Sequence, residues 1–113
     1  MNSLQLLAGQ KEISLTELTG QIKKDLSLSG IDTLFFEKIL SADDLLKNLQ
    51  QFIQEILTYH PADFDRFMYR VDVPEKEFSS LITTDLDTIV NKIVFLVLKR
   101  EMQKLVFRKQ FGQ

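Results

Sequence analysis

Residues 84–109, TDLDTIVNKIVFLVLKREMQKLVFRK, decide the fold, because they contain the longest apolar run of the chain, IVFLVL at 93–98. Taken alone, this run has the β-branched and aromatic residues that are typical of a buried strand. The residues on both sides favour a helix instead, since apolar side chains recur there every three or four positions. These positions are Leu86, Ile89 and Val90 before the run and Met102, Leu105 and Val106 after it. We therefore predict one long C-terminal helix that ends near Lys109.

A helix that is apolar on every side has to be covered on every side. The predicted helix 84–109 is therefore either the centre of a helical bundle, or it buries its outer face against another chain. In the second case the protein self-associates through six consecutive residues. These residues are Ile93, Val94, Phe95, Leu96, Val97 and Leu98.

The rest of the chain also reads as helices separated by capping signals. Residues 42–57 repeat apolar side chains at three- and four-residue spacing, which is typical of an amphipathic helix. Ser14 and Glu17 fit a capping box that starts another helix, and Gly30 suits the left-handed turn that ends it. Pro61 ends the helix 42–57 and starts the next, because the first helical position needs no amide. The apolar stripe of that next helix is Phe64, Phe67, Met68 and Val71.

Two shorter helices are expected in the connections. Asp32 is placed to cap the first. Asp72 is placed to cap the second, with Pro74 in its first turn. The apolar residues of the first are Leu34, Phe35, Ile39 and Leu40, and those of the second are Phe78, Leu81 and Ile82.

Together these patterns predict an all-α fold, a small bundle of about five helices packed around the long apolar C-terminal helix. The length of 113 residues indicates a single helical domain over 1–113. Residues 1–12 are the least determined part, because this segment either docks on the bundle or frays.

Composition excludes several classes of function. The net charge is −2, so the chain as a whole has no bulk attraction for nucleic acid or anionic lipid. The absence of cysteine excludes disulfides, thiolate metal sites and cysteine nucleophiles. No signal peptide is visible, and the run 93–98 is far shorter than the roughly 20 residues that span a bilayer. We expect a cytoplasmic protein that does not enter a membrane.

No motif in the chain indicates an enzyme. The Ser-His-Asp order, G-x-S-x-G, H-E-x-x-H and the P-loop are all absent, and the four glycines are too scattered to cradle a phosphate. His60, the only histidine, lies one helical turn from Asp63 and close to Asp65, as a metal ligand would. Such spacing is common, and His60 beside Pro61 more simply ends one helix or caps the next. We therefore assign no catalytic residue, no metal ligand and no cofactor.

The C-terminal segment 99–113 is basic, whereas the rest of the chain is acidic. Five Lys and Arg residues against Glu101 alone give it a net charge of +4, which leaves −6 for the rest by difference from −2. Arg100, Lys104 and Arg108 are four residues apart and share one helical face. Such a stripe is typical of a surface for nucleic acid or an acidic partner. The simpler interpretation is a solvated face whose bases complement the helix dipole.

The segment 59–75, YHPADFDRFMYRVDVPE, is the most distinctive of the chain, with its only histidine and both of its prolines. Tyr69 and Arg70 fall off the apolar stripe of their helix, and an exposed Tyr beside an Arg is typical of a protein interface. The simpler interpretation is that both pack across the corner between two helices. Arg70 would then hold a capping carboxylate such as Asp72 or Glu75.

Two segments, FDRFMYRVDVPEKEF at 64–78 and VLKREMQKL at 97–105, together resemble a family of short, all-helical bacterial proteins. The family's pattern is a Tyr-Arg-(Ile/Val)-Asp-Val segment, followed by a C-terminal helix with a basic-Glu-x-Gln-Lys segment. The resemblance covers residues 60–109, and it implies no activity. It also leads to a packing hypothesis, in which Arg70 or Asp72 contacts the face that holds Arg100 and Lys104. The residues that it carries over are Tyr69, Arg70, Asp72, Arg100, Glu101, Gln103 and Lys104.

These patterns lead to two hypotheses about function. The first is a non-enzymatic protein that binds a protein partner or self-associates through residues 93–98. The alternative is a small regulator that binds nucleic acid or an acidic partner through the basic C-terminal helix face. The candidate interaction surface consists of Tyr69, Arg70, Asp72, Arg100, Lys104 and Arg108.

Overall fold

The computed structural model describes residues 1–80 and 85–112 and confirms the all-α fold. These residues form five α-helices and two 3₁₀ turns, with no β-strand among them. The elements are α1 (Ser3–Gly9), α2 (Leu15–Leu28), η1 (Leu34–Phe36), α3 (Ala42–Tyr59), α4 (Pro61–Val71), η2 (Glu75–Glu77) and α5 (Leu86–Gln110). Within the described part of the chain, no helix combines the length and the apolar character that crossing a bilayer requires.

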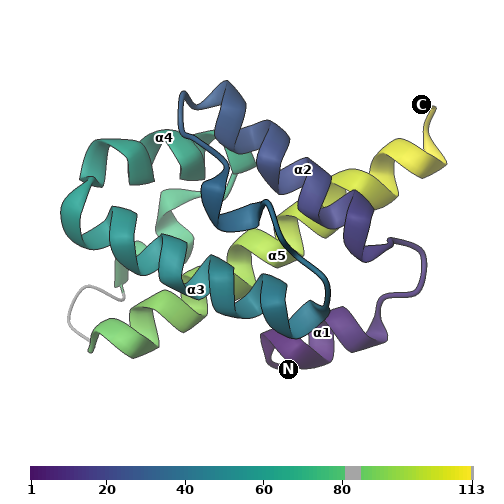
Figure 1. The fold of residues 1–113 in the computed structure, drawn as a ribbon, viewed down its shortest axis with the longest axis horizontal. Helices are drawn as coiled ribbons and strands as arrows, with labels where there is room; N and C mark the ends of the chain where they lie inside the picture. The colour runs from purple at the N-terminus through teal and green to yellow at the C-terminus, as the bar shows by residue number, and fades with distance from the viewer. Residues whose placement is uncertain (81–84, 113) are drawn as a thin grey trace.

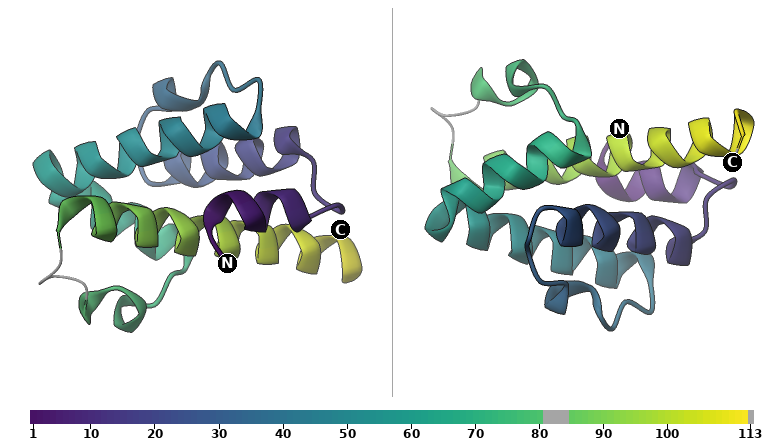
Figure 2. Two further views of the ribbon diagram at one scale, coloured as in Figure 1. Left: turned by 90° about the horizontal axis from the view of Figure 1, so that it is seen from below. Right: turned by 90° about the horizontal axis from the view of Figure 1, so that it is seen from above.

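Helix α5 runs across the molecule and contacts all four other α-helices (Figure 1). Figure 2 shows α1 lying alongside α5, where it also contacts α3. Five of the six side chains in the run 93–98 are buried inside this one chain, each at most 7% exposed, and Phe95 is half-buried. The predicted self-association surface at 93–98 is therefore not exposed, because helices of the same chain cover it.

The predicted capping signals set the bounds of α2. The hydroxyl of Ser14 accepts a hydrogen bond from the amide of Glu17, and the Glu17 carboxylate accepts one from the amide of Ser14, both at 3.0 Å. Gly30 adopts a φ of 77° just after the helix, the left-handed turn for which glycine is suited. Helix α2 consequently turns its apolar stripe to the core, with Leu18, Ile22 and Leu26 each at most 3% exposed.

Helices α3 and α4 form a pair that is joined at His60. Pro61 is the first residue of α4, as predicted, and Asp85 caps α5 by accepting the amide of Thr88 at 2.9 Å. The apolar stripes predicted for 42–57 and for α4 point inward, and their central residues are buried. The rings of Phe52 and Phe67 meet edge to face between the two helices, with centroids 5.5 Å apart.

The first of the predicted short helices is only the 3₁₀ turn η1. Asp32 accepts the amide of Leu34 at 3.0 Å, so the predicted cap is present. The predicted apolar face is only partly right: Phe35 and Ile39 pack against the core, whereas Leu34 and Leu40 are 75% and 87% exposed and Phe36 is buried instead. A 3₁₀ turn has three residues per turn, so a period of 3.6 assigns the wrong residues to the core.

Asp72 does not start the second short helix, as the sequence predicted, but ends α4. It has a φ of 74° and a ψ of 49°, the left-handed conformation that closes a helix. Pro74 precedes η2 instead of lying in its first turn. The prediction failed because a short polar residue between two helical patterns suits both the end of one helix and the start of the next.

The segment after η2 returns to the core through Phe78. The rings of Phe78 and Phe64 meet edge to face, with centroids 5.7 Å apart. Leu81 and Ile82, which were predicted to share a face with Phe78, lie outside the described residues.

Within the segment 1–12, residues 3–9 dock on the bundle as helix α1. Asn2 and Gln5 close a capping box at its start, with both hydrogen bonds at 2.8 Å. Leu6 and Leu7 pack against the core, and α1 contacts α3 and α5.

Candidate functional site

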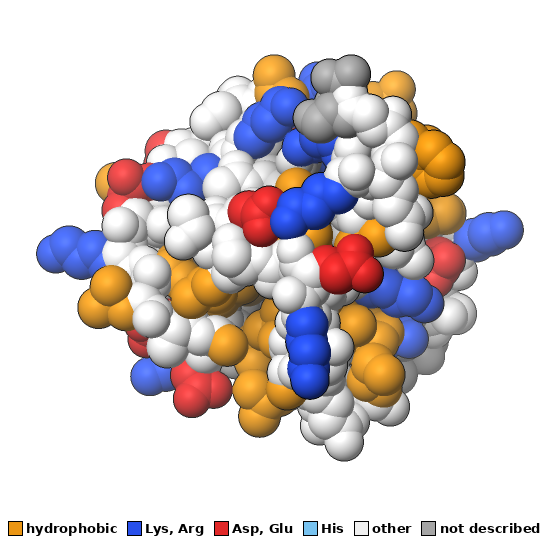
Figure 3. All heavy atoms as spheres, turned by 90° about the vertical axis from the view of Figure 1, so that its right-hand side faces the viewer, with side chains coloured by type: hydrophobic (Ala, Val, Ile, Leu, Met, Phe, Trp, Pro, Cys, Tyr) orange, Lys and Arg blue, Asp and Glu red, His pale blue; other side chains and the backbone are white. Residues whose placement is uncertain are grey.

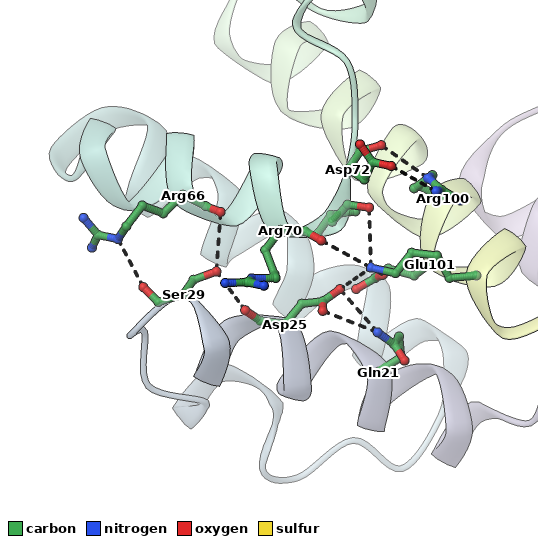
Figure 4. Close-up of polar contacts among 10 residues, drawn as sticks. Gln21, Asp25, Ser29, Arg66, Arg70, Asp72, Arg100 and Glu101 are labelled. Atoms are coloured by element: carbon green, nitrogen blue, oxygen red, sulfur yellow. Dashed lines mark hydrogen bonds and ion pairs between the residues drawn. The ribbon is translucent and has the colours of Figure 1, made fainter. Parts of the chain in front are cut away.

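The two segments that carry the resemblance meet where α4 ends against α5 (Figure 4). The Arg100 guanidinium donates from Nη2 to Oδ2 of Asp72 at 3.1 Å and from Nε to the Asp72 carbonyl at 3.3 Å. Lys104 Nζ donates to the backbone carbonyls of Arg70 and Val71 at 3.4 and 3.5 Å. The packing hypothesis is therefore confirmed for Asp72 and, through its carbonyl, for Arg70.

The corner interpretation named the wrong base for Asp72. Arg100 of α5, rather than Arg70, binds the Asp72 carboxylate. Tyr69 is 83% exposed, and Arg70 is also exposed, so these two side chains do not close the corner. The periodicity of α4 could not predict the pair of Asp72 with Arg100, because Arg100 lies on another helix, 28 residues further along the chain.

The left-handed conformation of Asp72 allows a direct stability test. We expect Asp72→Ala to be less stable than Asp72→Gly by about 1–2 kcal/mol, because a Cβ is strained at positive φ. Both variants lack the exposed pair with Arg100, so that loss cancels in the comparison. Urea denaturation of the two variants measures the difference, and equal midpoints would contradict the left-handed assignment.

Beneath this corner, α2 and α5 bury an ionic cluster, defined here as Asp25, Glu101 and Lys104 (Figure 4). Lys104 Nζ lies 2.6 Å from Oδ2 of Asp25 and 2.8 Å from Oε1 of Glu101. Asp25 is 3% exposed and Glu101 is fully buried. Gln21 Nε2 donates to both Asp25 oxygens at 3.4 Å. The ammonium group of Lys104 therefore lies in contact with two buried carboxyl groups.

Glu101 keeps its proton at neutral pH. Burial, first, and the neighbouring Asp25 raise the pKa of Glu101 to about 9, although Lys104 acts in the opposite direction. Lys104 Nζ is close to Glu101, but their orientation is not that of a hydrogen bond, and neither Glu101 oxygen has a hydrogen-bond partner among the described residues. With Glu101 neutral, the charges of Asp25 and Lys104 cancel inside the protein.

The geometry of the ionic cluster suits a structural role, the positioning of α2 and α4 against α5. Two carboxyl groups beside a lysine are also typical of acid–base catalysis, which needs a cleft where the substrate reaches them. Glu101 and Asp25 are too deeply buried for such access. Lys104 instead joins three helices, because it binds Asp25 of α2 and the terminal carbonyls of α4 from its place on α5.

Among the described residues, the main concave surface is an apolar groove of about 910 Å³ between the end of α3, α4, residues 72–79 and the first half of α5. Hydrophobic side chains from these elements form its walls. Among them are Phe64 and Met68 of α4, Val73 and Phe78 of the connection, and Ile89 and Ile93 of α5. Methionine and aromatic side chains adapt well to an apolar ligand surface.

The rim of the apolar groove is acidic. Asp65, Asp72 and Glu75 line it, and its described lining residues include no lysine or arginine. The exposed Tyr69 stands beside them. The sequence had singled out Tyr69 and Asp72 but not the groove itself, because its walls come from four separate segments.

The predicted basic face is only partly available to a partner. The Lys104 side chain is 18% exposed and bound to Asp25, and Arg100 is bound to Asp72. Arg108 is half-buried and lines a shallow depression with Phe107 and Phe111. Figure 3 looks onto this end of the molecule, where Lys and Arg side chains are more prominent than acidic ones and lie among hydrophobic groups. Internal carboxylates at two of the three bases weaken the attraction for a polyanion.

His60 lies between α3 and α4, as predicted for a residue that ends one helix, and its Nε2 is 3.9 Å from Glu55. Across residues 1–80 and 85–112, no three His, Cys, Asp or Glu side chains gather as a metal site would require.

No protein-family model matches the chain, and comparisons with curated proteins and with solved structures give no match either. The resemblance of residues 64–78 and 97–105 to short bacterial proteins stays a prediction. Its two segments do lie together in the fold.

Proposed function

We propose that this protein is a non-enzymatic interaction protein that binds an amphipathic, basic segment of a partner protein in the apolar groove. The observation that supports this proposal is the combination of hydrophobic walls with a rim whose described charges are all acidic. No comparable combination surrounds the buried ionic cluster, where a partner has no access.

The chemistry of the groove selects the kind of partner. An amphipathic helix binds a groove through apolar residues at positions i, i+3 or i+4, and i+7. Lys and Arg residues on its flanks would then face Asp65 and Glu75. These charges fix the orientation and accelerate association, while the apolar contacts provide most of the affinity.

A labelled peptide with leucine and lysine at helical spacing tests the proposal by fluorescence anisotropy. We expect saturable binding with a Kd of about 1–100 μM, and no binding of the same peptide with glutamate in place of lysine. Leu86 lines the groove and is 40% exposed, so Leu86→Lys places a repelling charge on its wall without opening the core. We expect this change to weaken binding at least about tenfold.

The matched control is Leu40→Lys, because Leu40 is 87% exposed and does not line the groove. This variant should bind the lysine peptide as tightly as the wild-type protein does. Equal binding of the lysine and glutamate peptides, or equal effects of the two substitutions, would refute the groove as the binding site.

A further inference from the structure

The apolar groove and the basic end of α5 lie on the same face of this helix. Leu86, Ile93, Arg100 and Phe107 are seven residues apart, and each heptad shifts a helical face by only about 20°. Leu86 and Ile93 line the groove, whereas Arg100 and Phe107 line the depression near the other end. One face of α5 therefore carries two different surfaces in succession.

The C-terminal part of this face is an aromatic ridge, defined here as Phe107, Arg108 and Phe111. The two phenylalanine rings lie against each other with centroids 4.8 Å apart, although the residues are 64% and 69% exposed. Single exposed apolar residues are ordinary, but a joined aromatic pair beside a base has the chemistry of a contact surface. It is apolar and basic, as the groove's partner should be.

We propose that the partner of the apolar groove is a second copy of this chain, whose aromatic ridge occupies the groove in a reciprocal dimer. This inference rests on the proposed function of the groove and names its occupant. It differs from self-association through residues 93–98, because that run is covered within the chain.

The spacing along α5 allows both contacts to form at once. The groove residues Ile89 and Ile93 of α5 have their midpoint at position 91, and the ridge residues Phe107 and Phe111 have theirs at position 109. Arg100 lies halfway between these two positions. At 1.5 Å per residue, the two centres are about 27 Å apart. Two α5 helices that cross antiparallel at Arg100 therefore bring each ridge to the groove of the other copy. Such a two-fold contact is closed and forms a dimer rather than a filament.

The charges agree with this arrangement. Arg108 of each ridge would approach the acidic rim of the other groove, where Asp65 and Glu75 lie. At the two-fold axis, each Asp72 side chain is 73% exposed beside its own Arg100, so it can also accept the Arg100 of the other copy. Opposite charges then face each other at both ends and at the centre of the contact.

Light scattering behind a sizing column tests the dimer over a range of protein concentrations. We expect the wild-type protein to be a dimer, and Phe107→Ser with Phe111→Ser to weaken dimerisation at least about a hundredfold, because both anchors of the ridge are removed. Leu34→Ser with Leu40→Ser is the control, since these residues are 75% and 87% exposed elsewhere. The control should remain dimeric, and circular dichroism should show that both double variants stay helical.

A charge exchange tests which surfaces meet. Asp65→Lys and Arg108→Glu should each weaken the dimer at least about tenfold, because each places like charges across both contacts. An equimolar mixture of the two variants should form a heterodimer, in which both contacts again pair opposite charges. Failure of the mixture to associate, when each single variant is a folded monomer, would overturn the ridge-in-groove arrangement.

The outcomes separate this inference from the proposed function. A wild-type protein that is monomeric up to about 1 mM overturns the dimer, whatever the peptide does. If the lysine peptide still binds that monomer, and Leu86→Lys weakens the binding of the peptide, the groove keeps its proposed function with a partner other than a second copy. If the peptide does not bind the Phe107→Ser, Phe111→Ser variant, whose groove is empty, the proposed function fails as well.

Discussion

Replacing Lys104 by methionine is expected to lower the free energy of unfolding by about 3–5 kcal/mol. Methionine keeps most of the aliphatic length but removes the only cation of the ionic cluster. Asp25, which is 3% exposed, would then be left buried without its cation, beside Glu101. The terminal carbonyls of Arg70 and Val71 would also lose their donor.

Urea denaturation measures this loss. Lys99→Met is the control, because Lys99 lies on the same helix but is exposed, and we expect a change within about 0.5 kcal/mol. Asp25→Asn combined with Lys104→Met should recover part of the loss, since the buried charge is removed together with its partner. A Lys104→Met variant as stable as the Lys99→Met control would show that the ionic cluster does not hold the helices together.

Replacing Glu101 by glutamine is expected to remove a pH dependence of stability. The pKa of Glu101 is about 9 in the folded protein, against an ordinary value of 4.5. Between these pH values the folded protein holds a proton that the unfolded chain releases, so the free energy of unfolding falls as the pH rises. The stabilising effect of the proton is complete below pH 4.5 and is lost by about pH 9. Within this window the slope approaches about 1.4 kcal/mol per pH unit.

Glutamine cannot lose a proton, so Glu101→Gln should stay close to the wild-type protein at pH 4.5 and become more stable than it as the pH rises. Melting temperatures of both proteins at several pH values between 5 and 8.5 give the comparison. Because all other groups titrate alike in the two proteins, their contributions cancel in the difference. Two curves that stay parallel would mean that Glu101 is ionised in the fold and that its raised pKa is wrong.

Several parts of the fold and of the corner at Asp72 were predictable from the sequence. The capping box at Ser14, the proline start of α4 and the spacing of apolar residues in α3 and α5 depend on neighbours within a few residues. The resemblance added one long-range statement, that Arg70 or Asp72 contacts the face of Arg100 and Lys104, and this contact is present.

The buried acid Glu101 was missed, although the sequence contained a signal for it. Glu101 follows Val97 by four residues and precedes Leu105 by four, so it lies on the apolar stripe of α5. In the sequence patterns it stands only as the single acid of a basic segment and as one residue of the family resemblance. Asp25 gave a weaker signal, because a polar residue near the end of α2 is ordinarily solvated.

The sequence by itself determined where α2, α3, α4 and α5 begin and which faces of α2, α3 and α4 are apolar, because caps and periodicity act over a few residues. It left open whether the run 93–98 is covered by its own chain or by another, and the tertiary structure decided this in favour of its own chain. The structure alone also placed Asp25 beside Lys104 and assembled the apolar groove. Burial, pKa and the shape of a groove depend on which helices meet, and that is decided by packing between residues far apart in the chain.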